Sequence, residues 1–253
     1  MLRIYLFDKT EALGRAAAAL AARTLRETVR RKGKAVFVAA TGASQFAFLE
    51  ALVREEVPWE RTVMFHLDEY IGLPADHPAS FRRYLRERLV DRVRPGTVHF
   101  IEGDAPDPAA EVQRLNGLIQ CEEVDIAFVG IGENGHIAFN DPPADFETDA
   151  PYIIVELAES CRRQQVSEGW FPSLHEVPQR AITMSVRQIL RSKRILSVVP
   201  EARKAAAVRC ALEGEISPAC PASILRTHPD VHLFLDRGSA GLLSPDTLER
   251  YRA

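Results

Sequence analysis

Short apolar runs alternate along the chain with longer amphipathic segments. The runs that predict strands occupy residues 3–7, 35–40, 62–67, 124–129, 194–199 and 231–235, with weaker candidates at 98–101 and 153–157. Most of them are rich in Val, Ile and Phe and lack polar alternation, as is typical of strands buried on both faces. The pattern predicts an α/β fold, in which helices cover both faces of a doubly wound, mostly parallel, Rossmann-like sheet.

Boundary residues support the helices predicted between these strands. Thr10 can cap a helix that continues to about residue 31, and Gly33 can end it. Ser80 can start a basic helix over residues 81–90, and Ser244, followed by Pro and Asp, can start a short final helix. The sequence has no repeat, low-complexity stretch or Gly/Ser linker, so we expect one domain over residues 1–253.

Composition and charge narrow the class of protein. The 32 Lys and Arg residues nearly balance 35 Asp and Glu, and a net charge of -3 gives no broad attraction to nucleic acid or to an anionic membrane. Four cysteines without a C-x-x-C pair are typical of free thiols in a reducing compartment. No apolar run is long enough for a signal peptide or a membrane span. We therefore expect a cytoplasmic protein with no nucleic-acid or membrane partner.

The loop Thr-Gly-Ala-Ser at residues 41–44 follows a predicted strand and precedes a helix predicted at about 45–53. In open α/β sheets, ligands bind beyond the carboxyl ends of the strands. A loop of small residues that enters a helix exposes backbone N–H groups, and the Thr41 and Ser44 hydroxyls add two more polar groups, which together suit a phosphate. An ordinary tight turn capped by Ser44 is the alternative interpretation.

Two adjacent acids, Asp68 and Glu69, follow the third predicted strand. Neighbouring side chains in an extended chain point in opposite directions, so one acid can face a cleft as a general base while the other is held by the structure. Both could instead be solvated. The apolar neighbours Tyr70, Ile71 and Leu73 favour a carboxylate whose pKa is raised toward the range of a general base.

The loop at residues 130–142 has the sequence Gly-Ile-Gly-Glu-Asn-Gly-His-Ile-Ala-Phe-Asn-Asp-Pro. Its three glycines allow close approach of a ligand to the backbone, while His136 and Asp141 supply a titratable pair. The glycines match the G-x-G-x-x-G spacing of dinucleotide sites. We reject that interpretation because the loop lies mid-chain and the segment after Gly135 would make a poor phosphate-binding helix. A lone His is more often a core residue, but its Gly, Asn and Asp neighbours favour a functional role.

The segments at 67–73 and 130–142 resemble the glucosamine-6-phosphate deaminase (isomerase) family. Residues 41–42 lie where that family has its sugar-phosphate loop, Lys204 follows a strand as the family's phosphate-binding lysine does, and residues 221–225 are similar to its C-terminal signature. Two long motifs in the right order make the resemblance specific, and it extends over nearly the whole chain.

The resemblance implies aldose–ketose isomerisation with deamination, which converts glucosamine 6-phosphate or a close amino-sugar phosphate to fructose 6-phosphate and ammonia. It implies that His136 opens the sugar ring, that Asp68 moves a proton between C2 and C1, and that no metal or redox cofactor is needed. The site residues that it implies are Asp68, Asn134, His136 and Asp141 for catalysis, and Thr41, Gly42, Ala43, Ser44, Gly130, Arg162 and Lys204 for substrate binding.

The chain departs from the family pattern at three positions. Asn134 stands where the best-known members have Asp, and it offers a hydrogen bond but no charge. Asp141 stands where they have Glu, and it reaches about 1.5 Å less. The family's phosphate-binding Arg has no clean counterpart, and Arg162 is matched to it only with a short insertion, with Arg163 nearly as good.

Two other functions remain open at this point. A 6-phosphogluconolactonase, from a related family with the same type of fold, is disfavoured because its loops read more like Asp-Glu-Arg and Gly-His-Thr. A sugar-phosphate sensor domain normally follows a helix-turn-helix, and here the first predicted strand begins almost at residue 1. A homo-oligomer is compatible with the sequence.

Overall fold

Seven parallel strands form the main sheet of the computed structural model, which describes all residues 1–253. The strand order is β1-β10-β9-β6-β2-β3-β5, and every pairing is parallel. The strands are β1 (Leu2–Phe7), β2 (Ala35–Ala39), β3 (Thr62–His66), β5 (Thr97–His99), β6 (Ile126–Val129), β9 (Ile195–Val199) and β10 (Val231–Asp236). The predicted α/β class and its parallel sheet are confirmed.

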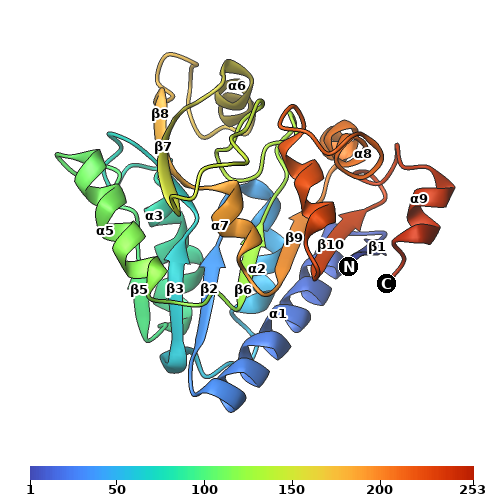
Figure 1. Cartoon of the computed structure of the whole chain (residues 1–253), viewed down its shortest axis with the longest axis horizontal. Coiled ribbons are helices and arrows are strands. Elements are labelled where there is room, and N and C mark those ends of the chain that lie inside the picture. The colour runs from blue at the N-terminus through green and yellow to red at the C-terminus, as the bar shows by residue number, and fades with distance from the viewer.

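A second, antiparallel sheet has the order β4-β8-β7. Its strands are β4 (Asp68–Tyr70), β7 (Tyr152–Glu156) and β8 (Arg180–Met184). The prediction of a strand at 153–157 is therefore confirmed, although that strand lies outside the main sheet, and β4 and β8 were not predicted. In Figure 1 this small sheet stands beyond the edge of the main sheet toward which the parallel strands point.

Helices cover both faces of the main sheet (Figure 1). They are α1 (Thr10–Lys32), α2 (Phe46–Leu52), α3 (Phe81–Leu85), α4 (Asp91–Val93), α5 (Pro108–Gln120), α6 (Glu159–Ser167), α7 (Val186–Leu190), α8 (Ala205–Glu213) and α9 (Pro245–Arg250). The 3-10 segments are η1 (Ala43–Gln45), η2 (Trp59–Arg61), η4 (Ala202–Lys204) and η5 (Pro221–Thr227), and η3 (Arg86–Val90) is a π-helical turn.

The side chains of β2 show how the two faces are filled. Phe37 and Ala39 belong to the apolar cluster that includes α1 and α2, whereas Val36 and Val38 belong to the cluster that includes α5, α7, α8 and η5. Successive side chains of a strand point to opposite faces of its sheet, so an unbroken apolar run is what a strand covered on both sides requires.

Helix boundaries follow the sequence with one exception. Gly33 ends α1 in the left-handed conformation at φ 80°, and the Ser80 and Ser244 side chains accept hydrogen bonds from the first turns of α3 and α9. The prediction that Thr10 caps α1 is wrong. Lys9 occupies the cap position without a side-chain hydrogen bond, and the Thr10 hydroxyl instead donates to Asp236 at 3.4 Å.

The close approach of α1 to α2 generates a stability prediction. A Cβ atom on Gly14 of α1 would lie 2.6 Å from the carbonyl carbon of Ala47 in α2, whereas a Cβ on Gly117 of α5 would meet nothing within 4 Å. We expect Gly14→Ala to lower the free energy of unfolding by about 1–3 kcal/mol through overpacking. Gly117→Ala should raise it by about 0.5–1 kcal/mol because Ala is the better helix former. Urea unfolding measures both, and equal effects of the two substitutions would contradict the close contact.

Candidate active site

A cavity opens at the carboxyl edge of the main sheet, where the loops after β2, β3, β6 and β9 converge. Parallel strands that are neighbours in the sheet bring the loops that follow them to one edge. The predicted site residues that line the cavity are Thr41, Gly42, Ala43, Ser44, Asp68, Gly130, His136 and Lys204. Residues far apart in the sequence are thus brought together as the positions of the predicted strands require.

The loop at residues 41–44 turns sharply out of β2 into η1 and α2. Gly42 has φ 97°, a conformation that is strained for residues with a side chain, and its carbonyl accepts hydrogen bonds from the Tyr84 hydroxyl and the Gln45 N–H. Ser44 accepts a hydrogen bond from the Gln45 side chain at 3.0 Å. The loop is held from outside the cavity by these contacts, so its small residues can face a ligand.

Asp68 is a buried acid without a hydrogen-bonding partner. It begins β4, its residue is 5% exposed, and its side chain lines the cavity and makes no hydrogen bond to the rest of the chain. Burial, followed by the nearby carboxylate of Glu69, raises the pKa of Asp68 to about 8. Such a group is protonated over much of the neutral range and can exchange a proton with a ligand in the cavity.

Glu69 points away from the cavity and is held by the start of α3. Its carboxylate accepts hydrogen bonds from the Ser80 hydroxyl and from the backbone N–H groups of Tyr70, Phe81 and Arg82. Burial raises its pKa to about 7, while these donors act to lower it. The two adjacent acids are therefore separated as strand alternation predicts.

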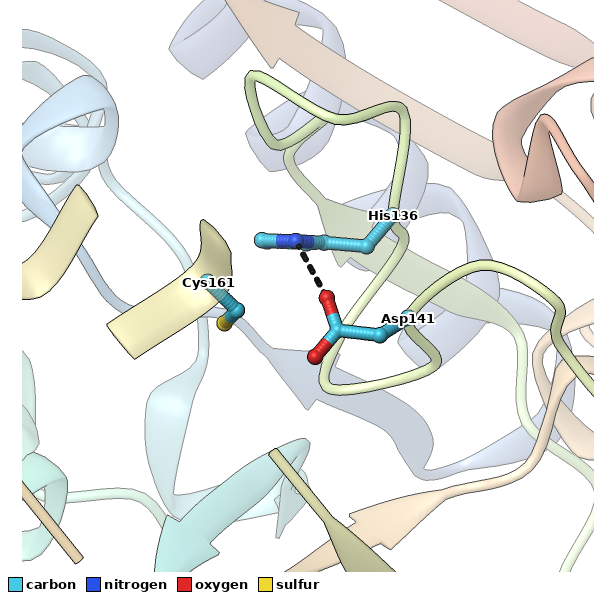
Figure 2. Close-up of side chains that lie close together, drawn as sticks. All are labelled: His136, Asp141 and Cys161. Carbon is cyan, nitrogen blue, oxygen red and sulfur yellow. Dashed lines mark ion pairs between the residues drawn. The ribbon is translucent and has the colours of Figure 1, made fainter. Parts of the chain in front are cut away.

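His136 lies over the carboxylate of Asp141. Its Nδ1 atom is 3.1 Å from Asp141 Oδ1, and Figure 2 shows that the carboxylate lies beneath the plane of the ring, so the contact is an electrostatic one without a well-aligned hydrogen bond. A Cβ atom on Gly132 would lie 2.2–2.4 Å from ring atoms of His136. Only glycine therefore leaves the imidazole room at this place.

Asn134 and the start of α6 fix the orientation of Asp141. Asn134 Nδ2 donates to Asp141 Oδ1 at 2.9 Å, and the backbone N–H of Ala158 donates to Oδ2 at 2.9 Å. Burial acts to raise the pKa of Asp141, but His136 and these two donors outweigh it, and the pKa lies below its ordinary value. The shorter acid at position 141 therefore still reaches the histidine, and Asn134 supplies the expected hydrogen bond.

Lys204 is a buried cation at the end of η4. Its residue is 3% exposed, it lines the cavity, and its ammonium forms no ion pair or hydrogen bond within the chain. Burial lowers its pKa, and the nearby carboxylate of Glu168 offsets part of that effect. An unpaired ammonium at such a place is suited to an anionic group of a ligand.

Arg162 is the predicted binding residue that the structure places away from the cavity. Its guanidinium donates to the carbonyl of Leu174 at 2.6 Å and does not line the cavity. The polar lining residues that the sequence did not point to are Gln164, Gln165 and Glu168, from the end of α6 and the turn after it. Gln164 and Glu168 are four residues apart and so lie on one face of a helix, which was the one available indication of a shared role. A polar helix face is usually exposed to solvent, so the spacing alone did not predict a cavity.

Arg203 binds three carboxylates, one of which, that of Glu168, lines the cavity. Its NH1 atom lies 2.9 Å from both Glu133 and Glu168, and its Nε lies 2.6 Å from Glu201. The three acids belong to the loop after β6, the turn after α6 and the loop after β9. Arg203 therefore holds these three segments together, and its charge is already neutralised.

One group of side chains beside the cavity has the donor types that a metal ion prefers. His136, Asp141 and Cys161 each offer one such atom, and these atoms lie within 4.8 Å of one another. Asp68, Glu69 and Lys204 do not belong to this group.

Comparison with known proteins agrees with the geometry. The chain is 38% identical to a glucosamine-6-phosphate deaminase of Exiguobacterium sibiricum over 90% of this chain and 89% of the relative, and 34% identical to one of Bacillus cereus over 90% and 86%. A solved monomeric glucosamine-6-phosphate deaminase superposes with a TM-score of 0.88 at 35% identity, covering 95% of this chain and all of the other. The 6-phosphogluconolactonase from Trypanosoma brucei, at 17% identity and a TM-score of 0.79 over 96% of this chain and 99% of the other, shares the fold.

The sequence profile described as glucosamine-6-phosphate isomerases/6-phosphogluconolactonase matches residues 8–233. This range holds the cavity and every residue named in it. The chain belongs to the glucosamine-6-phosphate isomerase/6-phosphogluconolactonase family.

Proposed function

We propose that the chain converts glucosamine 6-phosphate, or a close amino-sugar phosphate, to fructose 6-phosphate and ammonia. The observation that carries the proposal is the unpaired, buried Asp68 in a cavity that also holds His136 and an unpaired Lys204. The deaminase relatives, at 34–38% identity over 90% of this chain, support the substrate.

Asp68 is proposed as the group that moves the proton between C2 and C1. An aldose–ketose isomerisation needs a base that takes a proton from one carbon and returns it to the next, and that base works best with a pKa near the working pH. The pKa of Asp68, raised by burial and by Glu69 to about 8, meets this requirement. Its lack of other partners leaves the carboxylate free for the substrate.

His136 is proposed to open the sugar ring by transferring a proton to the ring oxygen. The carboxylate of Asp141, 3.1 Å from Nδ1, would stabilise the positive charge on the imidazole while it carries the proton that it passes to the sugar ring oxygen. Asn134 holds Asp141 in place. Asp141 and Asn134 lie behind the histidine and do not line the cavity, so they act through His136.

The phosphate group is proposed to lie between Lys204 and the loop at residues 41–44. Lys204 supplies a charge without a partner, and the loop supplies backbone N–H groups and the hydroxyls of Thr41 and Ser44. Arg162 has no place in this proposal because its guanidinium is turned to Leu174.

We further propose a cytoplasmic location. No helix combines the length and apolar character needed to cross a bilayer, and the structure has four unpaired cysteines. One solved relative is described as monomeric, and size-exclusion chromatography would measure the oligomeric state of this chain.

An assay of ammonia and ketose formation over a panel of hexosamine 6-phosphates and 6-phosphogluconolactone tests the function. We expect turnover of glucosamine 6-phosphate and little hydrolysis of the lactone. Asp68→Asn should reduce turnover by at least about 10²-fold, because it removes the proton carrier. Lactone hydrolysis alone would assign a lactonase, and binding without turnover of any sugar would assign a sensor.

The folding control for Asp68→Asn follows from the same raised pKa. Because the folded state holds the Asp68 proton up to about pH 8 and the unfolded state loses it near pH 4, ionisation of Asp68 lowers stability as pH rises through this window. Asp68→Asn should therefore melt at the same or a higher temperature than the unsubstituted protein at pH 8. A variant that loses turnover and melts lower would leave Asp68 as a structural residue.

The pH dependence of kcat/KM is a separate prediction. The ionised fraction of Asp68 should rise about tenfold per pH unit below its pKa of about 8, so kcat/KM should increase from pH 6 to 8. The lowered pKa of the Lys204 ammonium should produce a decline on the alkaline side, because burial disfavours its charge. A profile that is flat or falls between pH 6 and 8 would exclude Asp68 as the base.

Lys204→Met tests the phosphate end of the cavity. We expect KM for the sugar phosphate to rise about 10- to 100-fold, which is the usual worth of a hydrogen bond to a charged group. Affinity for the unphosphorylated amino sugar should stay the same. Lys34→Met, which removes an exposed lysine paired with Glu122, is the matched control and should leave both unchanged. Equal losses for phosphorylated and unphosphorylated sugars would place Lys204 outside the phosphate site.

A further inference from the structure

Cys161 of α6 meets the His136–Asp141 pair at the side of the cavity (Figure 2). The imidazole nitrogen, a carboxylate oxygen and the sulfur all lie within 4.8 Å of one another. The proposed reaction makes no use of the thiol. We propose that His136, Asp141 and Cys161 form a site for a thiophilic divalent cation such as Zn²⁺, and that the cation inhibits the enzyme by occupying its histidine.

The donor set selects the kind of ion. Zinc binds imidazole nitrogen, carboxylate oxygen and thiolate sulfur at about 2.0–2.3 Å, so ligand atoms around one tetrahedral ion lie about 3.3–3.8 Å apart. The three atoms, which lie within 4.8 Å of one another, must therefore approach each other by up to about 1–1.5 Å to reach these values. A sulfur ligand favours zinc-like ions over Mg²⁺ and Ca²⁺, which prefer oxygen. Three protein ligands leave a fourth position for water.

These three residues differ from an exposed cluster of polar side chains, because they are buried and one of their polar atoms has no hydrogen-bonding partner. Cys161 is fully buried, the Asp141 side chain is 7% exposed, and His136 Nδ1 is a buried nitrogen without a hydrogen-bonding partner. The Asp141 carboxylate is oriented by Asn134 and by the N–H of Ala158, as a metal-binding carboxylate usually is. No lysine or arginine pairs with this carboxylate, so its charge is available to a cation.

Binding of the cation requires two local changes. The imidazole must turn about its Cβ–Cγ bond, because a metal ion lies in the ring plane of its histidine and the Asp141 carboxylate lies beneath that plane (Figure 2). The thiol of Cys161 must also lose its proton, which passes to solvent as the sulfur–metal bond forms. Because the metal then occupies Nδ1, His136 can no longer take up and pass on a proton. Its electrostatic contact with Asp141 is replaced by bonds from both residues to the metal.

Binding of Co²⁺ to the whole protein tests the site without reference to turnover. Co²⁺ takes the ligands of Zn²⁺, and a thiolate ligand gives an intense near-ultraviolet charge-transfer band. We expect this band with the unsubstituted protein, its bleaching by one equivalent of Zn²⁺, and its loss in Cys161→Ser. Asp141→Asn should weaken Co²⁺ binding at least about tenfold, through loss of a ligand. Circular dichroism establishes that each variant is folded.

Cys210→Ser is the matched control because Cys210 and Cys220 are the other neighbouring thiols of the chain. We expect it to keep the full band. A band that disappears in Cys210→Ser and persists in Cys161→Ser would overturn the proposal and assign the metal to the Cys210–Cys220 pair. Absence of a charge-transfer band from the unsubstituted protein would overturn it as well.

The inhibitory effect rests on the proposed function and has its own measurement. For each variant, the rate with Zn²⁺ is divided by the rate without it. We expect strong inhibition of the unsubstituted protein and of Cys210→Ser. Inhibition of Cys161→Ser should be at least about tenfold weaker. Equal inhibition of all three would overturn inhibition through this site. A protein that binds Co²⁺ through Cys161 but turns over no sugar phosphate would leave the metal site standing and refute the proposed function.

Discussion

The site depends on the buried carboxylate of Glu69. An ionised carboxylate in the protein interior is costly unless donors surround it, and here the Ser80 hydroxyl and the N–H groups of Phe81 and Arg82 meet it at the first turn of α3. These bonds tie β4 to α3, which follows it along the chain. Because the next side chain along a strand points the other way, fixing Glu69 also fixes the direction of Asp68.

The two neighbouring acids therefore have opposite surroundings. Glu69 has a full set of donors, whereas Asp68 has none and lies beside the charge of Glu69. Burial and repulsion make the ionised form of Asp68 unfavourable until a ligand brings a compensating group. The cavity therefore holds a carboxyl group, that of Asp68, which forms no hydrogen bond or ion pair within the chain, beside a second carboxyl group that its donors hold in place.

The sequence was sufficient for the main sheet and for most of the cavity. Continuous apolar runs predicted its strands, and the carboxyl ends of those strands located Asp68, His136 and Lys204. The sequence was insufficient where contacts between distant segments determine strand pairing or a helix cap. The strand β8 (Arg180–Met184) is short and begins with an exposed arginine, and the placement of β7 beside it comes from pairing that no local pattern specifies. Thr10 does not cap α1 as predicted, because its hydroxyl donates a hydrogen bond to Asp236, which is distant in the sequence.

The polar segment around α6 was the weakest part of the sequence prediction. Arg162 and Arg163 have the charge expected of a phosphate ligand, but the first bonds to Leu174 and the second to Glu159. Which polar residue of such a helix turns to a cavity depends on how the helix docks. Here Gln164 does so, with Glu168 beyond the end of the helix.

The ion pairs of Arg203 bear on how strongly a phosphorylated ligand would be held in the proposed complex. Since Glu133, Glu168 and Glu201 already neutralise its guanidinium, Lys204 is the cation left for a bound phosphate group in the proposed complex. A dianion that meets one ammonium among several carboxylates is attracted less strongly than one held between two cations. In the proposed complex, this arrangement of charges would favour rapid release of the phosphorylated product.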